Sequence, residues 1–180
     1  MPLIVSLLRH AKSSWANPGM DDAHRPLNAR GRDAAPLIAA WMAENAIIPD
    51  TVLCSTATRA TETSALVLPA LSPQPAPQYR DDLYLASPDA LLAMLRALPD
   101  AVQHVMIVGH NPGLEALAQR LTGSGDKQAR QHLAEKFPTA ALAVLRFEAK
   151  SWAKIAPRKG RLLHFITPRW LDQQGGDGDD

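Results

Sequence analysis

The sequence predicts an α/β fold of three layers, α/β/α, with a mainly parallel central sheet flanked by helices. Short apolar runs typical of buried strands alternate along the chain with stretches whose apolar residues have helical spacing. Polar residues directly follow three of these runs, over residues 3–8, 51–55 and 105–109. Open α/β sheets bind ligands beyond the carboxyl ends of their strands, so these polar residues define a candidate site.

The first predicted strand, residues 3–8, ends at Arg9 and His10. Five of its six residues are aliphatic, which is typical of a strand buried on both faces. A guanidinium presents a fixed fork of donors to phosphate oxygens, and an imidazole can attack phosphorus as a nucleophile near neutral pH. The pair indicates phosphoryl chemistry, although a capping or salt-bridging pair explains these two residues equally well.

A loop and a helix are expected after this strand. Residues 15–22 favour turns and are expected to lie over the strand end. Asn28 is the expected N-cap of a helix over residues 29–44. Trp15 either lines the pocket or anchors the loop, and Arg25 either shapes a phosphate entrance or is solvated. In both cases we expect the second, simpler role.

The second predicted strand, residues 51–55, leads into a helix over residues 58–68 with Arg59 in its first turn. The free N–H groups at a helix amino terminus favour anions, so a phosphate beside Arg59 would gain from both. Cys54 is the single cysteine, which excludes a disulfide scaffold and a zinc cluster. Its apolar surroundings indicate a buried small residue.

The third predicted strand, residues 105–109, ends at His110 and leads into a helix that extends through Leu121. Residues 123–126 are expected to be flexible, and the polar region up to Phe137 is expected to hold a short helix at most. The other expected elements are a proline-rich connector over residues 69–77, a helix over residues 88–97, and strands over residues 140–147 and 161–166. We expect one domain over residues 1–170 and a disordered acidic tail over residues 171–180.

Taken in order, three motifs resemble the signatures of the histidine phosphatase superfamily, also called phosphoglycerate mutase-like. These are Arg9-His10-Ala11, the Ser-x-x-x-Arg-Ala-x-x-Thr run from Ser55 to Thr63, and Gly109-His110. The short chain, the Arg-His-Ala-Lys-Ser start and the stretch over residues 24–31 resemble its SixA-type phosphohistidine phosphatases. The resemblance extends from about residue 3 to residue 169 and implies the minimal form of the fold, without the helical lid of the mutases.

The resemblance also implies a mechanism. His10 would attack phosphorus to form a phosphohistidine enzyme, which water would then hydrolyse. The phosphoryl group would be bound by cationic and polar side chains, namely Arg9, Arg59, His110 and Ser13. Because these cations supply the positive charge, no metal or organic cofactor is expected. The sequence leaves open whether Lys12, Ser13 and Ser14 touch phosphate or only shape their loop.

One departure from the family pattern bears on the substrate. Many members carry a glutamate general acid in a Leu-x-Glu setting, where this chain has Leu83-Tyr84-Leu85. Asp81 and Asp82 are close in sequence and are the candidate replacements. An alkoxide leaving group needs a proton donor, whereas the imidazole of phosphohistidine can carry its own proton. The missing acid therefore favours phosphohistidine on a protein, such as a histidine phosphotransfer domain.

Two alternatives stay open at the level of the sequence. The chain is either a broad phosphomonoesterase of small metabolites, or a weakly catalytic module that binds phosphate or a partner. The net charge of +1 argues against a nucleic-acid binder. The apolar start is too short to span a membrane and lacks the features of a secretion signal, so we expect a cytoplasmic protein with no membrane partner.

Overall fold

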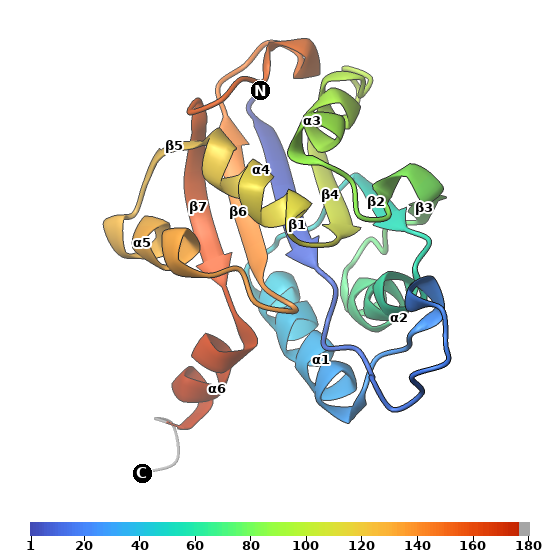
Figure 1. The fold of residues 1–180 in the computed structure, drawn as a ribbon. Coiled ribbons are helices and arrows are strands. Elements are labelled where there is room, and N and C mark those ends of the chain that lie inside the picture. The colour runs from blue at the N-terminus through green and yellow to red at the C-terminus, as the bar shows by residue number, and fades with distance from the viewer. Residues whose placement is uncertain (177–180) are drawn as a thin grey trace.

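The computed structural model describes residues 1–176 and contains one seven-stranded sheet between two layers of helices (Figure 1). The strands are β1 (Leu3–Arg9), β2 (Thr51–Ser55), β3 (Pro77–Arg80), β4 (His104–Gly109), β5 (Thr122–Gly125), β6 (Leu142–Phe147) and β7 (Gly160–Ile166). The helices are α1 (Ala29–Glu44), α2 (Thr58–Val67), α3 (Pro88–Arg96), α4 (Gly113–Leu121), α5 (Lys127–Glu135) and α6 (Pro168–Gly176). The predicted three-layer α/β fold is confirmed.

The order of strands across the sheet is β3-β2-β4-β1-β6-β7-β5. Strand β6 runs antiparallel to both of its neighbours, and the remaining strand pairs are parallel. The sheet is therefore mainly parallel, as the alternation of strands and helices predicts. Strands β2, β4 and β1 are adjacent, and the arrowheads of β1, β4 and β7 point in the same direction (Figure 1). The polar residues that follow these strands therefore lie at the same end of the sheet.

Successive side chains of a strand point to opposite faces of the sheet, so a hydrophobic core forms on each face, between the sheet and a layer of helices. On one face, Leu7 of β1 packs in a cluster with leucines of α3 and α4. On the other face, Leu8 packs with residues of α1 and α2. Both leucines are fully buried, and each such side chain stabilises the fold by roughly 1.5–3 kcal/mol. Strand β1 is thereby held rigidly, and so are Arg9 and His10 at its end.

Helix α1 approaches the loop after β1 closely at Gly31. A Cβ atom at this position would lie 2.1 Å from the Lys12 carbonyl oxygen, which is backbone and has little freedom to move. Gly31→Ala is therefore expected to lower the free energy of unfolding by about 1–3 kcal/mol, as overpacking does. Thermal unfolding checks this against Gly175→Ala, where a Cβ atom would meet nothing within 4 Å. Equal melting temperatures for the two variants would contradict the prediction.

The structure differs from the sequence-based expectations in three places. Residues 122–125 form the edge strand β5, so the prediction of a flexible segment at 123–126 is wrong. Strand β3 lies at the opposite edge and was not expected. Helix α6 continues to Gly176, although a disordered tail is expected from residue 171; the remaining part of that tail, 177–180, lies outside the described residues.

The connection from β2 to β4 consists of α2, β3 and α3 with two short 3₁₀ turns, and it adds no helical lid to the described part of the chain. None of the helices that the structure describes has the length and apolar character needed to cross a membrane.

Candidate active site

A pocket of about 480 Å³ lies at the carboxyl ends of β1, β2 and β4. Five predicted site residues line it together, namely Arg9, His10, Ser13, Arg59 and His110. Arg9 and His10 come from β1 and the residue after it, Arg59 from the first turn of α2, and His110 from the residue after β4. The three motifs, far apart in sequence, therefore form one site.

His10 is held in the form required of a nucleophile. Its Nδ1 atom lies 2.6 Å from the Ala11 carbonyl oxygen, which only accepts hydrogen bonds, so Nδ1 carries the ring proton. The Nε2 atom consequently keeps a free lone pair. Burial, with smaller contributions from His110 and the nearby arginines, lowers the pKa of His10 to about 3. The imidazole is thus neutral at physiological pH.

His110 lies close to His10, with 5.2 Å between the ring centroids. Its Nε2 atom is 2.7 Å from the Ser55 hydroxyl, which also accepts a hydrogen bond from the Ala57 N–H. With its proton on Nδ1, the His110 ring accepts from this hydroxyl and presents an N–H group of its own. Burial lowers the pKa of His110 to about 4, so this ring is also neutral. The serine of the second motif thus positions the histidine of the third.

Three buried side-chain nitrogens have no hydrogen-bond partner within the described residues: Arg9 Nε, Arg59 Nε and His110 Nδ1. All three belong to residues that line the pocket. An unsatisfied buried donor costs about 1–3 kcal/mol, and such groups are rare in native structures. Because the three residues line the same pocket as His10, the pocket is suited to an anion with several acceptor oxygens.

Asp22, from a 3₁₀ turn at Asp22–His24, also lines the pocket. Its carboxylate accepts hydrogen bonds from Arg59 Nη2 at 2.9 Å, Arg25 Nε at 3.0 Å and the Tyr84 hydroxyl. These contacts, first the Tyr84 hydroxyl and then the two guanidinium groups, hold the pKa of Asp22 far below its usual range. Asp22 is therefore ionised. The sequence interpretation missed it, because no motif surrounds it.

Arg25 corrects the expectation of a solvated loop arginine. It is buried and lines the pocket, where its Nη1 atom donates to Ser13 Oγ at 2.7 Å. Its guanidinium carbon lies 3.6 Å from the centre of the Trp15 ring, in a cation–π contact. Trp15 also lines the pocket, although its ring is largely exposed. Arg25 and Trp15 therefore both line the pocket, whereas the sequence analysis favoured a solvated arginine and a tryptophan that only anchors the loop.

Asp81 and Asp82, the candidate general acids, do not line the pocket. Asp81 accepts a hydrogen bond from the Thr56 hydroxyl at 2.7 Å. Asp82 pairs with Arg80 at 2.6 Å, and this contact lowers the pKa of its carboxyl. The structure therefore keeps both aspartates away from His10 and assigns them contacts at the surface.

Of the loop residues after His10, Lys12 and Ser13 line the pocket, whereas Ser14 stabilises the loop. Ser13 lines the pocket, and its hydroxyl accepts from Arg25 while its own proton is free to donate. Ser14 Oγ instead accepts from the Ala16 N–H at 3.1 Å and so shapes the loop. Lys12 lines the pocket and also a larger neighbouring groove.

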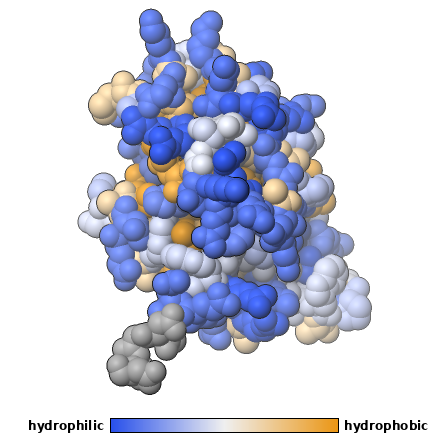
Figure 2. All heavy atoms as spheres, turned by 90° about the vertical axis from the view of Figure 1, so that its left-hand side faces the viewer, coloured by the Kyte–Doolittle hydropathy of each residue, from blue (hydrophilic) through white to orange (hydrophobic). Residues whose placement is uncertain are grey.

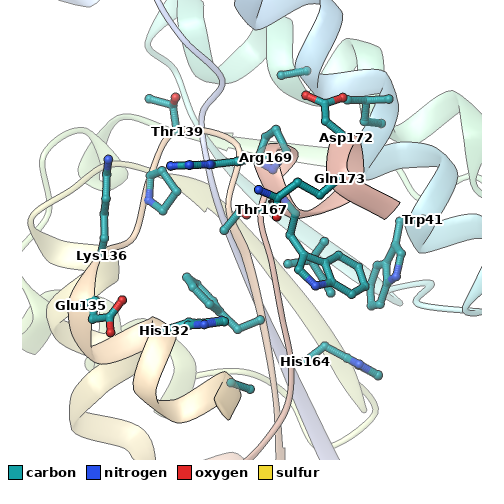
Figure 3. A pocket seen from close by; sticks show the side chains of 18 of the residues that line it. Trp41, His132, Glu135, Lys136, Thr139, His164, Thr167, Arg169, Asp172 and Gln173 are labelled. Atoms are coloured by element: carbon teal, nitrogen blue, oxygen red, sulfur yellow. Dashed lines mark hydrogen bonds between the residues drawn. The ribbon is translucent and has the colours of Figure 1, made fainter. Parts of the chain in front are cut away.

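This groove has a volume of about 1130 Å³ and runs between α1, α5, β7 and α6. It shares Lys12 and Thr139 with the catalytic pocket, so the two hollows adjoin. Figure 3 shows Arg169 of α6 pointing toward the side of Lys136, with Trp41 and His164 farther along the groove. Seen from the side of α5 and α6, apolar side chains lie between hydrophilic ones (Figure 2).

The described residues include no group of three or more histidine, cysteine or acidic side chains that could hold a metal ion.

The buried histidines make stability depend on pH. Burial lowers the pKa of His10 to about 3 and the pKa values of His104 and His110 to about 4, from 6.5. Below about pH 6.5 the unfolded chain binds protons that the folded chain does not, so stability falls as pH drops from 6.5 toward 4. Each histidine contributes up to about 1.4 kcal/mol per pH unit.

Urea unfolding at pH 7 and pH 5 measures this loss of stability. His104→Gln, far from the pocket but next to Ser6, is expected to reduce the loss, whereas substitution of the exposed His24 is expected to leave it unchanged. Stability that is equal at the two pH values would contradict the prediction.

Comparisons with known proteins identify the family of the chain. Residues 5–83 match the model of the histidine phosphatase superfamily, branch 1. An uncharacterised protein of Mycobacterium tuberculosis is 39% identical over 167 residues, which cover 90% of this chain and all of the relative. A crystal structure from Agrobacterium tumefaciens, assigned as a phosphohistidine phosphatase SixA, is 36% identical with a TM-score of 0.79 and covers 93% of this chain and 99% of that one. The protein histidine phosphatase SixA complexed with tungstate has a TM-score of 0.75 at 23% identity, covering 94% of this chain and 99% of that one. This last likeness concerns the fold alone.

Proposed function

The chain belongs to the histidine phosphatase superfamily and is of SixA type, and from this premise we propose that it removes phosphoryl groups from phosphohistidine on a protein. One observation carries the proposal: His10, held as a neutral nucleophile, shares its pocket with Arg9, Arg59 and His110, each of which has a buried nitrogen without a hydrogen-bond partner among the described residues. The partner we propose is a histidine phosphotransfer domain or a protein with an equally exposed phosphohistidine.

In the first step, the Nε2 lone pair of His10 attacks phosphorus while the bond to the leaving group breaks. Arg9, Arg59 and His110 present donors to the phosphoryl oxygens, on which negative charge is spread in the transition state. Because these donors are fixed before the substrate arrives, they do not need to reorganise. The lone pair of His10 is available at neutral pH because its pKa is about 3.

In the second step, water attacks the phosphorus bound to His10, and inorganic phosphate leaves. The His10 ring departs from phosphorus as neutral imidazole, because its proton stays on Nδ1 throughout, where it is donated to the Ala11 carbonyl oxygen. The positive charge of Arg9 and Arg59 suffices for both steps, so we propose that neither step needs a metal ion.

The pocket favours a bond from phosphorus to nitrogen over a bond from phosphorus to oxygen. An alkoxide leaving group needs a proton from an acid, but Asp22 is ionised, and Asp81 and Asp82 lie outside the pocket. An imidazole leaving group needs no such acid. The adjoining groove of about 1130 Å³ also provides a surface on which a protein that carries the phosphohistidine would rest.

The test compares two substrates at neutral pH in the presence of a chelator. We expect faster turnover of a phosphohistidine-bearing phosphotransfer domain than of a small alkyl phosphate such as glycerol phosphate. Rapid hydrolysis of the alkyl phosphate with no loss of phosphohistidine would replace the proposal with a metabolite phosphomonoesterase. A phosphoenzyme that accumulates without release would indicate a binding module.

A further inference from the structure

Asp22 is the only acidic residue among the described residues that line the phosphate pocket. Its neighbours there include Arg9, Arg25 and Arg59. A carboxylate repels a phosphoryl dianion, since like charges at short range in a partly buried site disfavour each other. Binding of the phosphoryl group alone therefore does not account for the place of Asp22.

The contacts of Asp22 leave part of its carboxylate free. Oδ2 accepts from Arg59 and from the Tyr84 hydroxyl, whereas Oδ1 accepts from Arg25 alone. An ionised carboxylate has about four acceptor positions. The side chain of Asp22 is 45% exposed, although those of Arg59 and Arg25 are 4% and 9% exposed. Oδ1 thus keeps an unused acceptor position, on a side chain that lines the pocket and is held in place by three donors.

Resting on the proposed function, we infer that Asp22 accepts a hydrogen bond from the ring N–H of the substrate phosphohistidine and thereby selects imidazole as the leaving group. The imidazole ring has two nitrogens, one bonded to phosphorus and one that carries a proton. Asp22 stabilises that proton on the ring. It acts as an ionised acceptor and transfers no proton.

The first step then balances without an acid. The Nε2 lone pair of His10 forms the new bond to phosphorus, and the electron pair of the breaking bond goes to the substrate nitrogen. The ring already carries a proton on its other nitrogen, so it leaves as neutral imidazole. The His10 ring keeps its proton in the same way, because Nδ1–H donates to the Ala11 carbonyl oxygen, with 2.6 Å between nitrogen and oxygen. Asp22 accepts a hydrogen bond from the ring N–H of the substrate, as this carbonyl oxygen accepts one from Nδ1–H of His10.

A purely structural role for Asp22 is the competing explanation, because the residue connects Arg59, Arg25 and Tyr84. Asp22→Asn separates the two roles. Asparagine has the same shape and an oxygen that still accepts from Arg59. Its amide nitrogen then takes the place of Oδ1, so the side chain loses the charge and the acceptor that the substrate ring and Arg25 would use. The experiment measures kcat/KM of the full chain for phosphohistidine, for p-nitrophenyl phosphate, whose leaving group needs little protonation, and for glycerol phosphate.

We expect Asp22→Asn to lower kcat/KM for phosphohistidine by about 10- to 100-fold, the factor for one hydrogen bond to a charged group. Turnover of p-nitrophenyl phosphate is expected to stay within about 3-fold or to rise, because a repulsive charge is gone. Asp22→Glu, which restores the charge, is expected to recover part of the phosphohistidine activity. Asp21→Asn is the matched control, since the Asp21 side chain is 85% exposed and does not line the pocket.

Two results would overturn the inference while leaving the proposed function intact. An equal loss for all three substrates would show that Asp22 only positions Arg59. A loss confined to glycerol phosphate would make Asp22 a proton donor for ester cleavage. Failure of the wild-type protein to hydrolyse phosphohistidine would instead reject the proposed function itself, and with it the inference. Should Asp22→Asn unfold, the Asp22→Glu variant decides between the same outcomes through its ratio of phosphohistidine to p-nitrophenyl phosphate turnover.

Discussion

Replacing His10 with alanine is expected to abolish phosphatase activity, with kcat/KM reduced by at least about 10⁴-fold, because no other group in the pocket takes over as nucleophile. The covalent intermediate disappears with it. Wild-type protein mixed with labelled substrate and quenched in base is expected to retain an acid-labile phosphate on the chain, whereas His10→Ala retains none. Single-turnover kinetics and this labelling experiment check the prediction together.

His24→Ala is the matched control for the nucleophile, because His24 is exposed and does not line the pocket. It is expected to turn over at the wild-type rate and to become labelled. Thermal unfolding of His10→Ala shows whether the fold persists. Covalent labelling of a folded His10→Ala protein would assign the nucleophile to another residue.

Arg59→Met is expected to lower kcat by about 10²- to 10³-fold, the cost of removing one preorganised donor to a developing oxyanion. Methionine fills similar space, so the loss reports the missing guanidinium rather than a cavity. Because the donor acts mainly in the transition state, kcat is expected to fall more than substrate affinity.

Arg80→Met is the control for this arginine, because Arg80 also pairs with an aspartate but lies outside the pocket. Its activity is expected to match the wild type. A kcat of Arg59→Met within a factor of about three of the wild type would show that Arg59 does not contact the phosphoryl group in the transition state.

The central strands and the four motif residues could be predicted from the sequence because each carries a local signal. Strand β1 is apolar on both faces because it lies in the middle of the sheet, and its polar end marks the site. The edge strands carry no such signal. Residues 77–80 of β3 are exposed or half-buried, and β5 consists of Thr-Gly-Ser-Gly, so neither shows an apolar pattern.

The place of Asp22 in the site could not be predicted for a related reason. Its role depends on contacts that the fold makes between distant segments. Asp22 meets Arg59 across 37 positions of the chain and Tyr84 across 62. A loop residue that becomes part of a site only through such tertiary contacts has no signature in its own neighbourhood. Asp81 and Asp82 show the opposite relation: they are near the expected position in sequence, but their side chains contact Thr56 and Arg80 and do not line the pocket.

The arrangement of the sheet also bears on how such a protein can diversify. The candidate site residues lie at the ends of β1 and β4 and in the first turn of α2, whereas the neighbouring groove is built from α1, α5, β7 and α6. The two regions share two lining residues, Lys12 and Thr139. If the groove receives the protein that carries the phosphohistidine, as we propose, mutations in the groove would change the partner and leave the residues around His10 unchanged. On that proposal, grafting the groove helices between relatives would exchange their partner proteins and keep the chemistry.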